Sequence, residues 1–265
     1  MGKVLEALAE AEKAFIAKQK VFFVATAPLS SEHHINVSPK APGSSVVVID
    51  SHTVAYCDFS GSGAETAAHL IENGRITLLF CNIEAGPPKL LRIHGTGSVI
   101  PKEDAKPSLL AEFDKSITSN PGFRAVYLVK VDRISSSCGY SMPVMKFEKY
   151  RNTLDEWTIK KGSKGMDDYR LQKNSFSIDG LPSLSVASKH TLKGQEDSFV
   201  IAPVEQEGYI YGKLIQKEEG DSRSYNPHIP RTTKEREGMN VLTNVAFLSV
   251  AFLVGYLFGS GKQIR

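Results

Sequence analysis

The run from Ser60 to Gly63 combines two hydroxyl side chains with two glycines and stands directly before a helical stretch. The helix expected at Ala64–Glu72 would direct unpaired backbone N–H groups and a partial positive charge toward this loop. Hydroxyls, amides and a helix N-terminus together suit a phosphate group. The same pattern is also typical of a capped turn without a ligand, so both interpretations stay open.

Two basic residues could add charge to such a site. Lys40 closes an alternating strand expected at His34–Ser38, and it either pairs with a phosphate or lies on the surface as a lone lysine. Arg92 lies within Leu-Leu-Arg-Ile-His. Strict alternation places Arg92 on the same face as His94, where it faces either a cofactor or solvent.

Motifs for other kinds of chemistry are missing from the sequence. It contains no Walker A motif, no HExxH and no G-x-S-x-G around Ser137 or Ser141. His33 and His34 are adjacent but have no third ligand at metal spacing, so a polar turn is expected there. The sequence therefore offers no catalytic group of its own, and a cofactor is expected to carry any chemistry.

The elements around these residues indicate an antiparallel β structure. Asn73–Gly74 is expected to end the helix, since both residues tolerate the left-handed conformation past a C-cap. About six strands with short turns predict a closed or nearly closed barrel over the first hundred residues. These strands are expected at residues 22–27, 34–38, 44–50, 53–57, 75–82 and 89–100.

Further elements are expected on both sides of this core. Helices are predicted at residues 4–20, 104–116 and 160–173, and a short helix is predicted to begin at Thr153 as its N-cap. A strand is predicted at 124–131, a tight turn at 177–182, and one or two marginal strands within 196–211.

Composition describes an ordinary globular protein with one good core. The net charge of +3, from 32 Lys and Arg against 29 Asp and Glu, is too small to indicate nucleic-acid binding. Charged residues from Glu6 to Lys13 interrupt any secretory leader. Cys57, Cys81 and Cys138 are widely spaced and indicate buried thiols in a reducing compartment.

The C-terminal tail has a different composition. Residues 239–261 carry no charge, and Val241–Phe258 is almost entirely apolar. Roughly twenty such residues match a helix that crosses a hydrocarbon core of ~30 Å. The tail therefore predicts a single membrane anchor with the rest of the chain cytosolic, on a mitochondrial outer, peroxisomal or endoplasmic-reticulum membrane. Thr243, Asn244 and Ser249 leave a buried C-terminal helix as the alternative.

Several separated motifs over residues 1–185 resemble the pyridoxamine 5'-phosphate oxidase-like flavin-binding family. They are Asn-Val-Ser-Pro-Lys (36–40), Gly-Ser-Gly-Ala-Glu-Thr (61–66), Glu-Asn-Gly-Arg-Ile-Thr (72–77), Ser-Cys-Gly-Tyr (137–140) and Ser-Ile-Asp-Gly-Leu-Pro (177–182). The resemblance implies an α+β, mainly β chain with a six-stranded antiparallel split β-barrel. It also implies a homodimer with FMN at the dimer interface.

The resemblance further implies which residues bind FMN. Lys40 and the Ser60–Thr66 loop would hold the phosphate, and Asn36, Ser38 and Arg92 would lie nearer the ring. The complete expected set is Asn36, Ser38, Lys40, Ser60, Gly61, Ser62, Thr66 and Arg92.

The chain departs from the family's oxidases at three positions. Glu65–Thr66 stands where the oxidases carry an arginine–lysine pair, and Ile35 replaces the second-strand arginine. Charge-assisted hydrogen bonds contribute ~1.5–3 kcal/mol each, so the loss weakens a dianion site by several kcal/mol. Hydrogen bonds from the loop amides and from the Ser62 and Thr66 hydroxyls offset part of this lost binding free energy.

The resulting expectation is a split-barrel domain (1–185), a loop-rich extension and linker (186–238) and a membrane anchor (239–261). The leading hypothesis is an FMN-dependent oxidoreductase on an unspecified substrate. The alternatives are a non-catalytic, membrane-anchored binding or scaffolding protein that has lost the cofactor, and a barrel that binds a different flavin-like or tetrapyrrole ligand.

Overall fold

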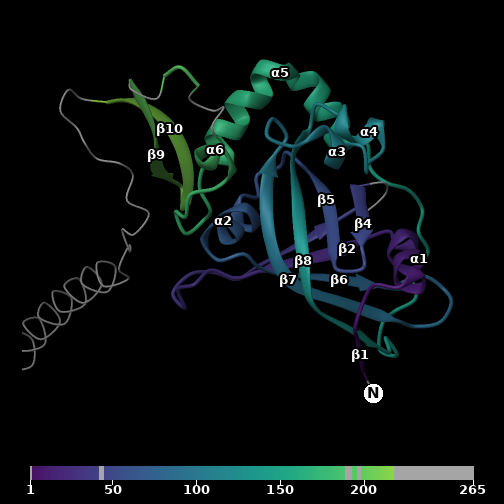
Figure 1. Cartoon of the computed structure of the whole chain (residues 1–265). Helices are drawn as coiled ribbons and strands as arrows, with labels where there is room; N and C mark the ends of the chain where they lie inside the picture. The colour runs from purple at the N-terminus through teal and green to yellow at the C-terminus, as the bar shows by residue number, and fades with distance from the viewer. Residues whose placement is uncertain (1, 42–44, 189–192, 196–197, 218–265) are drawn as a thin grey trace, which may run out of the picture. The chain divides into compact units, whose positions relative to one another are not determined.

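The computed structural model describes residues 2–41, 45–188, 193–195 and 198–217 (Figure 1). An antiparallel sheet with the strand order β3-β2-β6-β7-β8-β5-β4 dominates this part of the chain, and β1 pairs with β8. The strands are β1 Lys3–Leu5, β2 Phe22–Thr26, β3 Asn36–Lys40, β4 Val46–Asp50, β5 Thr53–Phe59, β6 Arg75–Cys81, β7 Leu90–Pro101 and β8 Phe123–Ser137.

All six strands predicted for the first hundred residues are present, and so is the one predicted at 124–131. These are seven of the eight strands of the sheet, which therefore has two more strands than the six-stranded barrel that the resemblance implies. The unforeseen strand is β1. Its three residues pair with Ile134–Ser136 of β8, a long-range contact that overrides the helical pattern of the sequence.

The core forms because alternate residues of each strand point to one face of the sheet. In β2, Phe22 and Val24 are fully buried while Phe23 and Ala25 are only half-buried. The Phe22 ring stacks on Phe80 at 5.2 Å between ring centroids, which joins β2 to β6. Burial of each such side chain contributes roughly 1.5–3 kcal/mol.

Helices cover the sheet at several places. They are α1 Glu10–Lys18, α2 Glu65–Glu72, α3 Pro107–Leu110, α4 Lys115–Thr118, α5 Thr153–Lys173 and α6 Leu184–Ala187. Helix α2 packs against β2, β6 and β7 (Figure 1). It ends as predicted, with Asn73 as the C-cap and Gly74 at a φ of 73°.

Three helix predictions need correction. The helix expected at 4–20 begins only at Glu10, because β1 takes the preceding residues. The helix expected at 104–116 is two single turns, and Pro107 at the start of the first donates no N–H. The N-cap of α5 is Asn152 rather than Thr153.

Helix α5 joins the two helices expected around residues 153 and 160–173, with a kink at Gly162 (φ 67°, ψ 177°). It is less solvent-facing than its charges suggest, since Thr158 and Met166 are buried. The predicted turn at 177–182 is present, with Gly180 at a φ of 78° and a bridge between Phe176 and Pro182.

One of the marginal strands expected within 196–211 is β9 (Phe199–Gln206), which pairs antiparallel with β10 (Tyr209–Gln216), a strand that extends beyond the expected range. Gly212 of β10 lies directly on the end of α5, where a Cβ atom would collide with the Leu171 carbonyl and with Ser175. The hairpin therefore continues the packing of α5.

The thiol prediction is confirmed for Cys57 and Cys81, which are buried, and is wrong for Cys138, which is exposed. Among the helices of the described residues, none combines the length and the apolar character that crossing a membrane requires. The predicted anchor at 239–261 lies outside the described residues.

Candidate functional site

Strand β3 and the first turn of α2 bring together three of the expected residues. The Asn36 side-chain amide donates to the Thr66 hydroxyl at 3.0 Å, and the Ser38 hydroxyl donates to Asn36 Oδ1 at 3.2 Å. Alternation along β3 puts Asn36, Ser38 and Lys40 on one face of the sheet. This polar face lies beside the helix N-terminus, as a phosphate site would require.

Lys40 lies on this face but is already paired. Its ammonium group is 2.5 Å from Oδ1 of Asp58, a buried carboxylate on β5. The Arg124 guanidinium contacts the other oxygen of Asp58, with Nε at 2.8 Å and Nη2 at 2.7 Å. Burial alone would raise the pKa of Asp58, but Arg124 and Lys40 outweigh it and hold the pKa at about 2.

Asp58 and Arg124 are site residues that the sequence reasoning missed. Asp58 is the one charged residue of β5, Arg124 lies next to the apolar run 125–129 of β8, and a buried charge must be paired. That signal could have identified them as partners. Their pairing changes the electrostatics, because the Asp58 carboxylate is in contact with both cations, Lys40 and Arg124.

The glycine-rich loop is held by the C-terminal part of the described chain. The Ser60 hydroxyl accepts a hydrogen bond from Arg170 Nε at 2.8 Å, and the Gly61 carbonyl accepts one from Asn174 Nδ2 at 2.8 Å. The Arg124 guanidinium donates to the carbonyl of Gly63 at 2.9 Å. Ser60 is fully buried, so its side chain serves the packing of α5.

The remaining part of the loop is open. Ser62 and Gly63 are exposed and line a cavity of about 370 Å³ together with residues of α5 and β10. Of the four predicted loop and helix residues, Thr66 contacts Asn36 at the candidate site and Ser62 lines this cavity. The Ser60 hydroxyl and the Gly61 carbonyl are instead directed to Arg170 and Asn174.

Arg92 lies on the opposite face of the sheet from Lys40. Its neighbour Leu91 is fully buried in the core. Directly paired residues lead from Leu91 across β6 and β2 to Lys40, and paired residues point to the same face of a sheet, so Lys40 lies on the inner face with Leu91. Arg92 therefore points outward, where Nη1 donates to the Ser137 hydroxyl at 3.2 Å. It shares this outer face with His94, as predicted.

The two adjacent histidines lie in the connection between β2 and β3. His34 contacts Asp179 twice, through Nδ1 at 2.7 Å and through its backbone N–H at 2.9 Å. His33 is half-buried, and its Nδ1 finds no hydrogen-bond partner among the described residues. No group of three or more potential metal ligands occurs in the described residues.

His69 of α2 lies close to this connection. Its Nδ1 pairs with the Thr26 hydroxyl at 2.9 Å, and its Nε2 has no partner in the described part of the chain. Burial lowers the pKa of His69, so the imidazole is neutral at pH 7.

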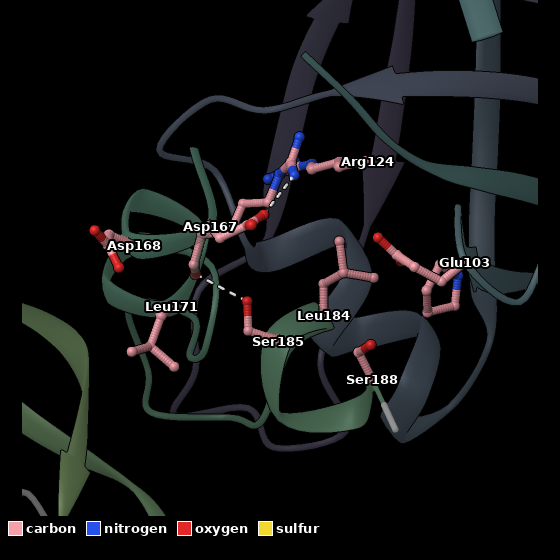
Figure 2. A pocket seen from close by; sticks show the side chains of 10 residues that line it. Glu103, Arg124, Asp167, Asp168, Leu171, Leu184, Ser185 and Ser188 are labelled. Carbon is pink, nitrogen blue, oxygen red and sulfur yellow. Dashed lines mark hydrogen bonds and ion pairs between the residues drawn. The ribbon is translucent and has the colours of Figure 1, made fainter. Parts of the chain in front are cut away.

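A second cavity, of about 410 Å³, lies between α5, α6 and the start of β8 (Figure 2). Arg170 lines it, but its Nη1 contacts Asp167 at 3.3 Å and its carbonyl accepts from the Ser185 hydroxyl at 2.8 Å. Arg124, which also lines it, is held by Asp58. These cations serve internal contacts.

The chain is similar to proteins of one known family. Residues 8–138 match the family model described as pyridoxamine 5'-phosphate oxidase. The chain is 36% identical over 202 residues to a pyridoxamine 5'-phosphate oxidase family protein, ustO, from Aspergillus flavus, covering 69% of this chain and 78% of that protein.

Solved structures show weaker likeness. HupZ from Group A Streptococcus is 23% identical, with a TM-score of 0.35 and coverage of 48% of this chain and 90% of that one. The FAD binding protein from Mycobacterium smegmatis is 12% identical, with a TM-score of 0.34 and coverage of 50% and 97%. On the strength of the curated relative and the family match, this chain belongs to the pyridoxamine 5'-phosphate oxidase family.

Proposed function

We propose that the protein binds FMN and acts as an FMN-dependent oxidoreductase. The observation that carries the proposal is the Asn36–Thr66 hydrogen bond, which joins the polar face of β3 to the N-terminus of α2. FMN, when bound, supplies the hydride chemistry that the side chains lack. Family membership supports the same cofactor.

The donor set fits the phosphate through its polar atoms more than through its charge. Ser62 and Thr66 are the residues that would hold it, beside the amides of α2, and Asn36 and Ser38 would lie nearer the ring. Lys40 would join Ser62 and Thr66 by exchanging Asp58 for the phosphate, since its ammonium can donate three hydrogen bonds.

Arg92 reaches a flavin in this proposal only from a second copy of the chain. The outer face that carries Arg92 continues across β6 and β2 to β3, where Val37 is 62% exposed; Ile35, just before β3, is 75% exposed. Apolar side chains this open are typical of a protein interface. We therefore include a homodimer, with FMN between the two copies, in the proposal.

The test is the visible absorbance of the purified full-length protein, followed by mass spectrometry of the ligand released on denaturation. Bound FMN is the expected result. Thr66→Val should weaken FMN binding about tenfold, because one hydrogen bond to a charged group contributes roughly 1.5 kcal/mol. Thr96→Val is the matched control, since Thr96 contacts Asp132 at a distance from the site. Colourless protein that FMN does not stabilise would contradict the proposal.

A non-catalytic binding or scaffolding protein is the second candidate, and the pairing of Lys40 with Asp58 favours it. A cation already neutralised at 2.5 Å attracts a phosphate weakly. In this case Glu65→Arg combined with Thr66→Lys would create flavin affinity that the wild type lacks. The ligand released from native protein also separates both candidates from a barrel that holds a tetrapyrrole.

We further propose that residues 239–261 anchor the protein to a membrane, with the split barrel in the cytosol. The support is the uncharged run of 23 residues, preceded by Arg231, Lys234 and Arg236 and followed by Lys262 and Arg265.

A further inference from the structure

The cavity of about 370 Å³ lies where three separate segments meet. The glycine-rich loop and the start of α2 form one wall, the end of α5 and the following turn form a second, and β10 forms the third. The lining residues are Ser62, Gly63, Glu65, Lys173, Phe176, Ile178, Tyr209, Ile210 and Tyr211. The volume is within the range of small-molecule sites, roughly 300–1,000 Å³.

Apolar and aromatic side chains supply most of the surface at one end of the cavity. Ile178 is 45% exposed and Tyr209 is 60% exposed. The rings of Tyr209 and Tyr211 lie 6.4 Å apart between centroids. A flat aromatic ring would cover these open side chains and remove their apolar surface from water.

Two opposite charges line the same cavity without pairing with each other. The Lys173 ammonium lies 3.7 Å from the centroid of the Tyr211 ring, and it forms no ion pair with a carboxylate of the described residues. Glu65 Oε2 accepts the backbone N–H of Ala64 at 3.0 Å. No ion pair connects Glu65 with Lys173 in the described residues.

We propose that this cavity binds an aromatic amino acid as its zwitterion. The ligand carboxylate pairs with Lys173, the ligand ammonium pairs with Glu65, and the ring lies against Tyr209 and Ile178. Charge complementarity selects this class of ligand, because an aromatic anion or an aromatic cation would leave one lining charge unpaired. The inference stands on the cavity alone and does not rest on the proposed flavin.

Calorimetric titration of the full-length protein without added FMN tests the proposal. The three probes are L-tryptophan, tryptamine, which lacks the carboxylate, and indole-3-propionate, which lacks the ammonium group. L-Tryptophan should bind at least tenfold more tightly than either analogue. Equal binding of all three probes, or binding of none, would overturn the proposal.

Two substitutions assign the charges. Lys173→Met should weaken the binding of L-tryptophan at least tenfold and leave the binding of tryptamine unchanged, because tryptamine has no carboxylate that could pair with Lys173. Glu65→Gln should weaken L-tryptophan and leave indole-3-propionate unchanged. Lys164→Met is the control for Lys173→Met, since Lys164 is an exposed lysine on the same helix. Equal losses in Lys173→Met and Lys164→Met would refute the assignment.

Tyr209→Ala provides a variant whose folding is expected to survive, because the Tyr209 side chain is largely exposed. It should weaken all three probes to a similar extent, since all three contain the same ring. Unchanged binding of L-tryptophan by a folded Tyr209→Ala protein would show that the ring lies elsewhere. The visible absorbance of bound FMN is measured separately, so a failure here is distinguishable from a failure of the flavin proposal.

Discussion

At the scale of single residues, Asp58 determines the electrostatics of the candidate site. It is a buried carboxylate between the cations of Lys40 and Arg124. Removal of one member of a buried ion pair typically costs about 3–5 kcal/mol, because a charge is left without compensation. Asp58 therefore stabilises the fold, and its ion pair with Lys40 competes with any pairing of Lys40 with a phosphate.

The first prediction follows from the pKa of Asp58, which is about 2 in the folded protein against an ordinary value of 3.8. Because the folded-state value is lower, the unfolded chain binds the proton first as the pH falls. Asp58 thus contributes about 2–3 kcal/mol above pH 4, and this contribution is lost between about pH 4 and pH 2. Urea unfolding of wild type and of Asp58→Asn at several pH values across this range measures the contribution of Asp58 to the free energy of unfolding.

Asp58→Asn should be less stable than wild type at pH 7, and the difference should shrink toward pH 2. Asp168→Asn is the control, because Asp168 is an exposed carboxylate and its removal should leave the curve close to that of wild type. If Asp58→Asn does not fold, Lys40→Met removes one of the two cations and should lower the pH dependence in the same range. A constant difference at every pH would contradict the prediction.

Which face of a strand is covered by protein is not determined by the local sequence pattern. The alternation in β3 was correctly detected, but it does not reveal which face is covered. Val37 is exposed, whereas the opposite, polar face of β3 is covered by protein: Asn36 contacts Thr66 of α2, and Lys40 contacts Asp58 of β5. The opposite orientations of Lys40 and Arg92 depend on strand pairing across four strands, which local pattern does not encode.

At the scale of elements, α5 and the β9–β10 hairpin complete the cavity of about 370 Å³ beside the glycine-rich loop. The close approach of β10 to α5 requires a residue without a side chain at position 212, since a Cβ atom would meet the Leu171 carbonyl and Ser175. Alternating and β-branched residues predict β2 to β8, and they predict one or two marginal strands within 196–211, where β9 lies; most of β10 lies beyond that range. The docking of that hairpin on α5 was not predictable, because it depends on one glycine at a long-range contact.

Gly212→Ala should therefore separate the hairpin from α5 without unfolding the sheet. Hydrogen exchange measured by mass spectrometry should show faster exchange in β9 and β10 and unchanged exchange in β2, β6 and β7. Gly165→Ala is the matched control. At that position a Cβ atom would make only an ordinary 3.5 Å contact with Lys161, and alanine favours the helix by up to about 1 kcal/mol.

At the scale of the whole molecule, the proposed anchor assigns residues 239–261 to a membrane, and the proposed homodimer assigns the outer face of β3 to the contact between two copies. The uncharged tail was recognised from composition alone, since length and hydropathy suffice to predict a membrane span. The dimer was expected from the family resemblance, and the exposed apolar outer face of β3 is consistent with it. The anchor proposal is tested by comparing the distribution of the full-length protein and of truncated proteins between the membrane pellet and the soluble fraction.

Deletion of residues 239–265 should move the protein from the membrane pellet to the soluble fraction after cell lysis. The physical reason is the loss of an apolar run that matches the hydrocarbon thickness. Deletion of residues 262–265 alone is the control and should leave the protein in the pellet. An unchanged distribution after the longer deletion would argue against the anchor.

The hydrogen bonds that hold the glycine-rich loop also set the order in which the protein can fold. Arg170 is 110 positions from Ser60, Asn174 is 113 from Gly61, and Ser183 is 119 from Ala64. A ribosome releases the loop long before these partners, so the loop's polar groups stay hydrated while the early strands pair. The ligand cavity is therefore completed late in synthesis, and ligand binding at this cavity begins only after α5 and the hairpin have docked.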